Sequence, residues 1–320
     1  MRSFSSHAVD KYHRTFKDDT SAMRTIAGLV TFSFALLATQ QSAAETPLVN
    51  LTSSSVIGEQ SSEVTFYAMG DVPYAPNEDL ILPKQIEELP LDGRFLIHLG
   101  DIKSGASPCA EEVYIKVSSM LRKAKSPTFI IPGDNEWNDC TSPNVAWKYW
   151  MKHFHNFDKN WEYDFEVKRQ KARNENFSFR LRGVLFVGIN LVGGRVHDEA
   201  EWKIRHAQNV AWLTQVLKAN HGAHQAIVLF GHAHPIVKHN DFFTPFVDLV
   251  EKAKLPVLYL HGDGHKWIKD KPFGTELITR VQVDQGGLAP PLKITVKPAL
   301  KDPFVFDRRL SPAQKQVLPR

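Results

Sequence analysis

Three stretches of the sequence share the pattern that decides the fold: residues 64–71 read VTFYAMGD, residues 95–101 read FLIHLGD and residues 128–134 read TFIIPGD. Each is a short apolar run, typical of a buried strand, followed by Gly-Asp. Glycine permits a tight turn at the end of a strand, and ligands of open α/β sheets bind beyond the carboxyl ends of the strands. We therefore expect three carboxylates to face one crevice. They belong to Asp71, Asp101 and Asp134.

Two histidine clusters follow further strand-like runs, and half of the 14 histidines fall between residues 221 and 265. The strand expected at Ala226–Phe230 leads into GHAHP, and the one expected at Val257–Leu260 leads into HGDGH, which holds a fourth Gly-Asp. Four unpaired carboxylates would repel one another, so the crevice calls for bound cations. Mixed imidazole and carboxylate ligands suit two-metal hydrolysis. The expected ligands here are His232, Asp263 and His265, while packing roles stay equally open for His234 and His261.

Helical spacing alternates with the strand-like runs, which predicts an α/β core with antiparallel additions. Helices are expected at Glu111–Lys125, Glu199–Ala219 and Phe243–Lys254, a hairpin at Phe177–Leu181 and Val184–Ile189, and late antiparallel strands at Glu276–Val283 and Leu292–Val296.

An uncharged, mostly apolar run occupies Ile26–Ala38, behind Arg24 and ahead of the small residues 42–44. This is the pattern of a signal peptide, and the run is too short to span a bilayer comfortably. The alternative is a buried helix of a cytosolic protein. We expect residues 1–44 to be a presequence, starting at Met1 or Met23, and the mature chain to be secreted or periplasmic without a membrane partner.

The net charge of +4 is too mild to indicate a nucleic-acid partner. The chain contains no Gly-x-Gly-x-x-Gly, P-loop or Cys-x-x-Cys-His motif, so nothing favours a nucleotide or heme module. Its two cysteines exclude a Cys-rich zinc module. An exported chain meets an oxidising compartment, so Cys109 and Cys140 are expected to form a disulfide, with two free thiols as the alternative.

Five motifs follow one another along residues 63–270: Gly70-Asp71, Gly100-Asp101, Gly133-Asp134-Asn135-Glu136, His232 and Gly262-Asp263-Gly264-His265. Their order resembles that of the calcineurin-like metallophosphoesterases, including the purple acid phosphatases, and PGDNEW at residues 132–137 resembles a divergent branch of that group. The resemblance implies an α/β fold built as a two-sheet β-sandwich flanked by helices, with mixed parallel and antiparallel strands. We expect a lead-in segment at 45–62, one metallophosphoesterase domain at 63–300 and a C-terminal tail at 301–320.

Carried over residue by residue, the resemblance implies two divalent metal ions (Mn, Fe, Mg or Zn) bridged by Asp101. A hydroxide held between the metals would attack phosphorus, and Lys103 would stabilise charge on the phosphoryl oxygens. One metal would take Asp71, Asp101 and His265, and the other Asp101, Asp134, His232 and Asp263.

This chain departs from the family pattern at five positions, of which Val72-Pro73 in place of x-His after Asp71 and Ser104 in place of Tyr or Asp are two. Asp134 replaces a metal-binding Asn, and Asp263 replaces a His. With four carboxylates the ligands would neutralise two divalent ions, which weakens them as Lewis acids. Asn135 stands where the family has a His that contacts substrate and protonates the leaving group. An amide donates a hydrogen bond but no proton, which leaves His234 and His261 as acids for poor leaving groups.

Two functions follow from these motifs. The first is an exported metal-dependent phosphoesterase acting on small phosphorylated substrates, with monoester, diester and pyrophosphate all open. The second is a degenerate relative that binds metal or a phosphorylated ligand without hydrolysing it. The oligomeric state has no sequence signature. Aromatic residues after the third motif are expected to pack as a helical cap, or alternatively to form a substrate wall: Trp137, Trp147, Tyr149, Trp150 and Trp161.

Overall fold

Two β-sheets enclose a phenylalanine-rich core in the computed structural model, which describes residues 63–318. The expected presequence and lead-in segment lie outside the described residues. Rings from the two sheets meet edge to face, with centroids 5.5 Å apart for Phe66 and Phe186 and 5.3 Å apart for Phe95 and Phe179. Such aromatic contacts add specific geometry to the burial of large apolar side chains.

The smaller sheet has five strands in the order β12-β11-β1-β2-β3. The first three strands of the chain run parallel to one another in it, while β11 is antiparallel to β1 and β12 to β11. The strands are β1 (Val64–Met69), β2 (Leu96–His98), β3 (Thr128–Ile130), β11 (Leu292–Val296) and β12 (Phe304–Asp307).

The larger sheet has seven strands in the order β4-β5-β6-β7-β8-β10-β9. Its centre, from β6 to β10, is parallel, and antiparallel strands close both edges. The strands are β4 (Val167–Arg169), β5 (Phe177–Leu181), β6 (Val184–Gly188), β7 (Ala226–Phe230), β8 (Val257–His261), β9 (Ile268–Asp270) and β10 (Ile278–Gln282).

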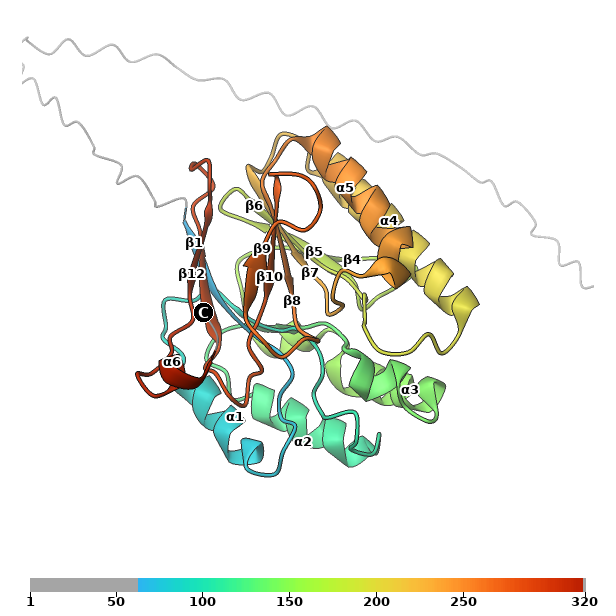
Figure 1. Cartoon of the computed structure of the whole chain (residues 1–320), viewed down its shortest axis with the longest axis vertical. Coiled ribbons are helices and arrows are strands. Elements are labelled where there is room, and N and C mark those ends of the chain that lie inside the picture. Colours follow the sequence, from blue (N-terminus) through green and yellow to red (C-terminus); the bar gives the residue numbers. More distant parts are fainter. Residues whose placement is uncertain (1–62, 319–320) are drawn as a thin grey trace, which may run out of the picture. The chain divides into compact units, whose positions relative to one another are not determined.

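Helices cover the outer faces of both sheets. The α4–α5 pair lies side by side over the larger sheet, and α1, α2 and α3 pack on the smaller one (Figure 1). Asp198 begins α4 by accepting hydrogen bonds from two backbone amides of its first turn, as a helix cap does. The helices are α1 (Glu78–Glu87), α2 (Glu111–Leu121), α3 (Pro143–Phe154), α4 (Glu199–Ala219), α5 (Asn240–Ala253) and α6 (Gln314–Val317), with short turns η1 (Asp134–Asn138), η2 (Phe157–Asn160) and η3 (Val237–His239).

The expected fold class is confirmed: two mixed sheets face each other between helices. One expectation holds only in part, because the strand at Glu276–Val283 is antiparallel to β9 but not to its other neighbour, β8. Its observed part, β10, pairs in parallel with β8, since the connection of residues 262–277 is long enough for a crossover. The helix expected to reach Lys125 ends at Leu121, ahead of Ser126-Pro127. Residues 301–320, expected as a tail, include β12, which extends the smaller sheet. Within residues 63–318, no helix has the length and apolar character of a membrane span.

Candidate metal centre

Parallel strands bring the predicted ligands to one edge of each sheet. Asp71, Asp101 and Asp134 follow β1, β2 and β3, while His232 and Asp263 follow β7 and β8. Several of these turns have unusual backbones, with φ of 57° at Asp71, 60° at Asp101 and 69° at Asp263. Non-glycine residues in this region of φ are strained and concentrate at functional sites.

One glycine in these turns permits a close approach. A Cβ atom built on Gly133 would lie 2.2 Å from the backbone nitrogen of Asp101 and from its Oδ1. No larger residue fits there, so the turns after β2 and β3 touch only because this position is glycine.

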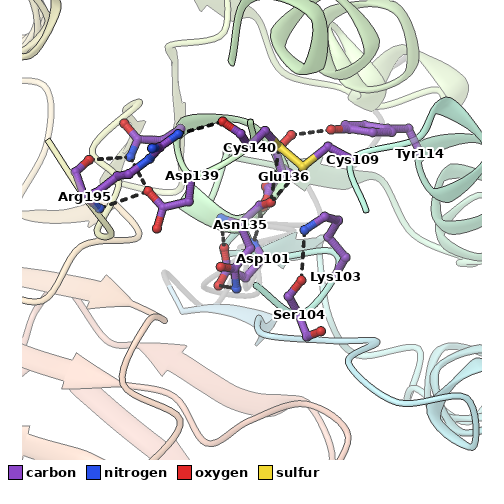
Figure 2. Close-up of a disulfide and its surroundings, with 11 residues drawn as sticks. Asp101, Lys103, Ser104, Cys109, Tyr114, Asn135, Glu136, Asp139, Cys140 and Arg195 are labelled. Atoms are coloured by element: carbon purple, nitrogen blue, oxygen red, sulfur yellow. Dashed lines mark hydrogen bonds between the residues drawn. A yellow bond between two sulfur atoms is a disulfide. The ribbon is translucent and has the colours of Figure 1, made fainter. Parts of the chain in front are cut away.

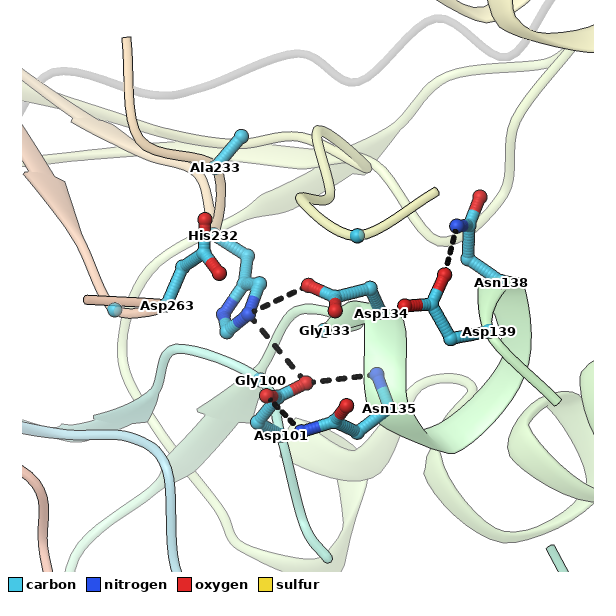
Figure 3. A network of polar contacts seen from close by, with 12 residues as sticks. Gly100, Asp101, Gly133, Asp134, Asn135, Asn138, Asp139, His232, Ala233 and Asp263 are labelled. Carbon is cyan, nitrogen blue, oxygen red and sulfur yellow. Dashed lines mark hydrogen bonds and ion pairs between the residues drawn. The ribbon is translucent and has the colours of Figure 1, made fainter. Parts of the chain in front are cut away.

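The side chains form two groups that share Asp101. Asp71, Asp101 and His265 present ligand atoms within 4.8 Å of one another, and so do Asp101, Asp134 and His232. In the second group, Nε2 of His232 lies 3.1 Å from Oδ1 of Asp134 and 3.4 Å from Oδ1 of Asp101 (Figure 3). In the first, Nε2 of His265 lies 3.5 Å from Oδ1 of Asp71. A carboxylate shared in this way could bridge two metal ions, as two-metal hydrolysis needs the ions close together.

Three buried ligand atoms of these groups have no hydrogen-bond partner outside the groups: Oδ2 of Asp71, Oδ1 of Asp134 and Nε2 of His232. Buried polar atoms left without a partner are destabilising. The other ring nitrogen of His232, Nδ1, lies 2.7 Å from the carbonyl oxygen of Leu99, to which it donates. The lone pair of Nε2 therefore faces the carboxylates, as in a metal-binding histidine whose orientation is fixed by a second partner. The donor set fits divalent metal ions.

Burial and mutual repulsion perturb the acids. Burial raises the pKa of Asp71, and burial together with the charge of Asp101 raises the pKa of Asp134. Burial alone would raise the pKa of Asp101, but the neighbouring His232 and hydrogen bonds hold it below its usual value. Burial alone would lower the pKa of His232, yet Asp101 and Asp134 together raise it well above its usual value. Without a bound cation, the crevice therefore needs a positive imidazolium to balance its carboxylates.

Asp263 lies next to these groups but belongs to neither. Its backbone N–H donates to Oδ1 of Asp71 over 3.1 Å, and its Oδ2 accepts from the backbone N–H of His234 over 3.2 Å. Its carboxylate faces the crevice beside His232 (Figure 3), and its charge contributes to the raised pKa of Asp134.

Asn135 and Lys103 lie on either side of Asp101 (Figure 2). The backbone N–H of Asn135 donates to Oδ1 of Asp101 over 2.9 Å, and its side-chain amide donates to Oδ2. The ammonium of Lys103 donates to the carbonyl oxygen of Ser104 over 2.9 Å. Burial lowers the pKa of Lys103, against the pull of nearby carboxylates.

The two histidines proposed as acids differ in access. Nδ1 of His234 lies 3.1 Å from Oε1 of Gln282, and the ring is partly exposed. His261 is fully buried, stacks on Tyr259 and contacts the carbonyl oxygen of Gly262. Burial lowers its pKa well below the usual value, so this imidazole is neutral.

Two residues at the centre were not predicted from the sequence. The Tyr74 hydroxyl donates to Oδ2 of Asp101 over 2.6 Å and lies 3.3 Å from both Asp71 and His265. Burial and the charge of Asp101 raise its pKa. The carboxylate of Glu136 accepts from the backbone N–H groups of Gly133 and Asp101 over 2.6 and 3.1 Å. The signal for Tyr74 was its place three residues after Asp71.

The expected disulfide is confirmed. Cys109 and Cys140 are bonded, and each sulfur lies 3.6 Å from the carbonyl oxygen of Asn135 (Figure 2). The bond joins the segments that follow β2 and β3, beside the residue whose amides hold Asp101.

The aromatic residues after the third motif pack on one another. Trp147 stacks on Trp150 at 5.2 Å between ring centroids and contacts Trp137 at 4.8 Å. Trp137 and Trp147 also line a cavity of about 480 Å³ together with Arg195. These aromatic residues therefore pack on one another, and some of them also form part of a cavity wall.

No family model and no curated protein matches the chain. Among solved structures it is similar to a dimetal phosphatase from Danio rerio, at 13% identity over 72% of this chain and 91% of the other, with a TM-score of 0.47. It is similar to a 5'-nucleotidase from Candida albicans, at 15% identity over 76% of this chain and 50% of the other, with a TM-score of 0.46. It is also similar to a purple acid phosphatase from yellow lupin (Lupinus luteus) seeds, at 12% identity over 74% of this chain and 50% of the other, with a TM-score of 0.47. The function proposed below rests on the sequence motifs and the geometry of the site.

Proposed function

We propose that the chain is an exported, metal-dependent phosphoesterase that hydrolyses small phosphorylated substrates at a dinuclear centre. The observation that carries the proposal is the pair of ligand groups sharing Asp101. Buried ligand atoms without hydrogen-bond partners, in both groups, support the same conclusion. The disulfide and the signal-peptide pattern support export.

The two groups divide the ligands between two ions. Asp71 and His265 would hold one ion, Asp134 and His232 the other, and Asp101 would bridge them, with Asp263 adding a fourth carboxylate beside the second. Two divalent ions would supply Lewis-acid activation of water and of the phosphoryl group. The oxygen-rich donor set is compatible with Mn, Fe, Mg or Zn.

The protein holds its bridging carboxylate from several directions. Glu136 accepts from the backbone N–H of Asp101, while Tyr74 and Asn135 donate to its side chain. These contacts fix the carboxylate before a ligand arrives, and preorganised charge is the largest contribution to most active sites. A proton for the leaving group would come from His234, which is partly exposed, rather than from the buried His261.

Metal content and turnover test the proposal together. The purified chain, loaded in turn with Mn, Fe, Mg and Zn, is assayed on p-nitrophenyl phosphate and bis(p-nitrophenyl) phosphate. We expect two metal ions per chain and measurable hydrolysis. Asp101→Asn should reduce the metal content to one ion or fewer and turnover by more than about 100-fold. Loss of a residue that only hydrogen-bonds a metal ligand costs about 10–100-fold in metal affinity or activity, and loss of the ligand itself should cost more.

Asp241→Asn is the matched control, because Asp241 is an exposed aspartate of α5. It should keep both metal content and turnover. Full metal content and full activity in Asp101→Asn would contradict the shared-ligand arrangement, as would a wild-type chain that binds no metal.

A binder without hydrolytic activity is the second candidate. The side-chain amide of Asn135 is already engaged with Asp101 and lies 3.1 Å from the Tyr74 hydroxyl. It therefore offers substrate neither a proton nor a free donor. Metal binding without turnover on any phosphate ester would favour this reading.

A further inference from the structure

A small cavity lies beside the metal centre, on the side of Lys103. Its volume is about 140 Å³, and its walls come from the turn after β1, the segment after β2 and helix α2. Tyr74 belongs to both places: the side chain lines the cavity, and the hydroxyl lies 2.6 Å from Oδ2 of Asp101. One tyrosine therefore separates the cavity from the proposed bridging carboxylate.

The cavity is lined by a buried lysine, Lys103, that forms no close ion pair within the described part of the chain. Lys103 is 3% exposed, and its ammonium makes one hydrogen bond, to the carbonyl oxygen of Ser104. It forms no ion pair within 4.0 Å among residues 63–318. An ammonium has three donors, and a buried charge is destabilising unless it is paired. The second lysine of the cavity, Lys116, is already paired with Asp79 at 2.8 Å. Lys103 therefore has donors left for an anion bound in the cavity.

Two helices begin at the cavity. Asp79 belongs to the first turn of α1, and Val113 to the first turn of α2. The N-terminal end of a helix carries a partial positive charge and favours anions. The helix ends and Lys103 thus favour the same kind of ligand.

We infer that this cavity is a subsite for a second phosphate group of the substrate. The inference rests on the proposed function, in which the metal centre takes the scissile phosphate. The volume equals that of about four to five waters at ~30 Å³ each, which suits the five heavy atoms of a phosphate group. The substrate class is accordingly a small molecule that carries two phosphate groups on a short backbone.

Phosphate stoichiometry tests the subsite without any turnover. Inorganic phosphate is titrated calorimetrically into the metal-loaded full chain, the Lys103→Met variant and the Val113→Glu variant. Val113→Glu places a carboxylate in the cavity from the first helical turn, where acidic residues are favoured. Wild type should bind one more phosphate per chain than either variant. Lys218→Met, which removes an exposed lysine at the end of α4, should behave as wild type.

Paired substrates test the same subsite during turnover. Bisphosphates of ethane-1,2-diol and propane-1,3-diol are compared with ethyl and propyl phosphate. The KM of at least one bisphosphate should be tenfold or more below that of its monophosphate in wild type. The difference should vanish in both cavity variants and persist in Lys218→Met.

The outcomes separate this inference from the proposed function. Equal phosphate stoichiometry and affinity in wild type and both variants would overturn the subsite, whatever the activity. If no ester is hydrolysed with any metal, the proposed function fails, yet a one-phosphate difference between wild type and both variants would still establish the subsite. Thermal melts show whether each variant is folded, and the subsite is supported only if both folded variants give the same result.

Discussion

Removing the disulfide should destabilise the protein by an amount that its loop length sets. Cys109 and Cys140 are 31 residues apart. Closing a loop of that length in the unfolded chain corresponds to about 3.7 kcal/mol at 25 °C in the chain-entropy model. For a domain of this size, each kcal/mol lowers Tm by about 2–4 °C. The double replacement Cys109→Ser/Cys140→Ser should therefore lower Tm by about 7–15 °C.

Differential scanning calorimetry of the metal-loaded protein measures this shift. The single replacements provide an internal control, since either one breaks the bond. Each single variant should account for nearly the whole effect, and the second replacement should add little. Two small effects that sum in the double variant, or a total below about 2 °C, would refute the loop-closure reasoning, because only packing of the sulfurs would then be lost.

The same variants test whether the bond also positions the metal ligands. Both sulfurs lie at the carbonyl oxygen of Asn135, whose backbone N–H holds Oδ1 of Asp101. Looser control of that carboxylate should weaken metal binding in the folded protein. Titration with a competing chelator well below Tm measures it, and an unchanged metal affinity would limit the role of the bond to stability.

Three further predictions concern individual side chains. His206 and His239 are buried against each other, and burial lowers their pKa values to about 4 and about 3. As the pH falls, these histidines are protonated in the unfolded chain before they are protonated in the folded one, so the free energy of unfolding should fall by about 2 kcal/mol per histidine between pH 7 and pH 5. Urea melts at the two pH values check this. His206→Phe should make the free energy of unfolding depend less on pH. Tyr74→Phe removes the hydroxyl from Oδ2 of Asp101 and should weaken metal affinity about 10–100-fold by chelator competition. Asn135→His should raise the turnover of esters with poor leaving groups if the new histidine supplies the missing acid. A large rise from an inactive wild type would favour the binder without hydrolytic activity. Robust wild-type activity would exclude such a binder.

The strands that end at the candidate metal centre could be predicted from the sequence. The apolar run indicates a buried strand, and the glycine motif that follows indicates where the strand ends. Val64–Met69 is apolar except for Thr65, Ala226–Phe230 is apolar throughout, and the observed bounds of both are the predicted ones. The partner of β10 was not readable in the same way. Its alternation fits either direction of pairing, and the direction is set by a connection whose path depends on tertiary packing.

The polar residues around the ligands were harder to predict than the ligands. Asp101 and Asp134 follow a strand and a glycine, which is a local signal. Tyr74 follows Asp71 by three residues, which places it near the crevice, but its contact is with Asp101 of a different turn, 27 residues later in the chain. Glu136 lies within a recognised motif, but its role, to accept from the backbone N–H groups of two separate turns, exists only once β2 and β3 are adjacent.

The charge balance of the crevice links stability to function. The whole chain carries only +4, yet three of its aspartates are buried within one small region. Protonated His232 compensates part of that charge in the absence of metal, but its Nε2 lone pair is also needed for ligation. Metal binding must then displace a proton from the imidazole, so metal affinity should fall as the pH falls. The proposed ions would bind the folded chain, in which the ligands are brought together, so the stability of the fold should rise with metal concentration.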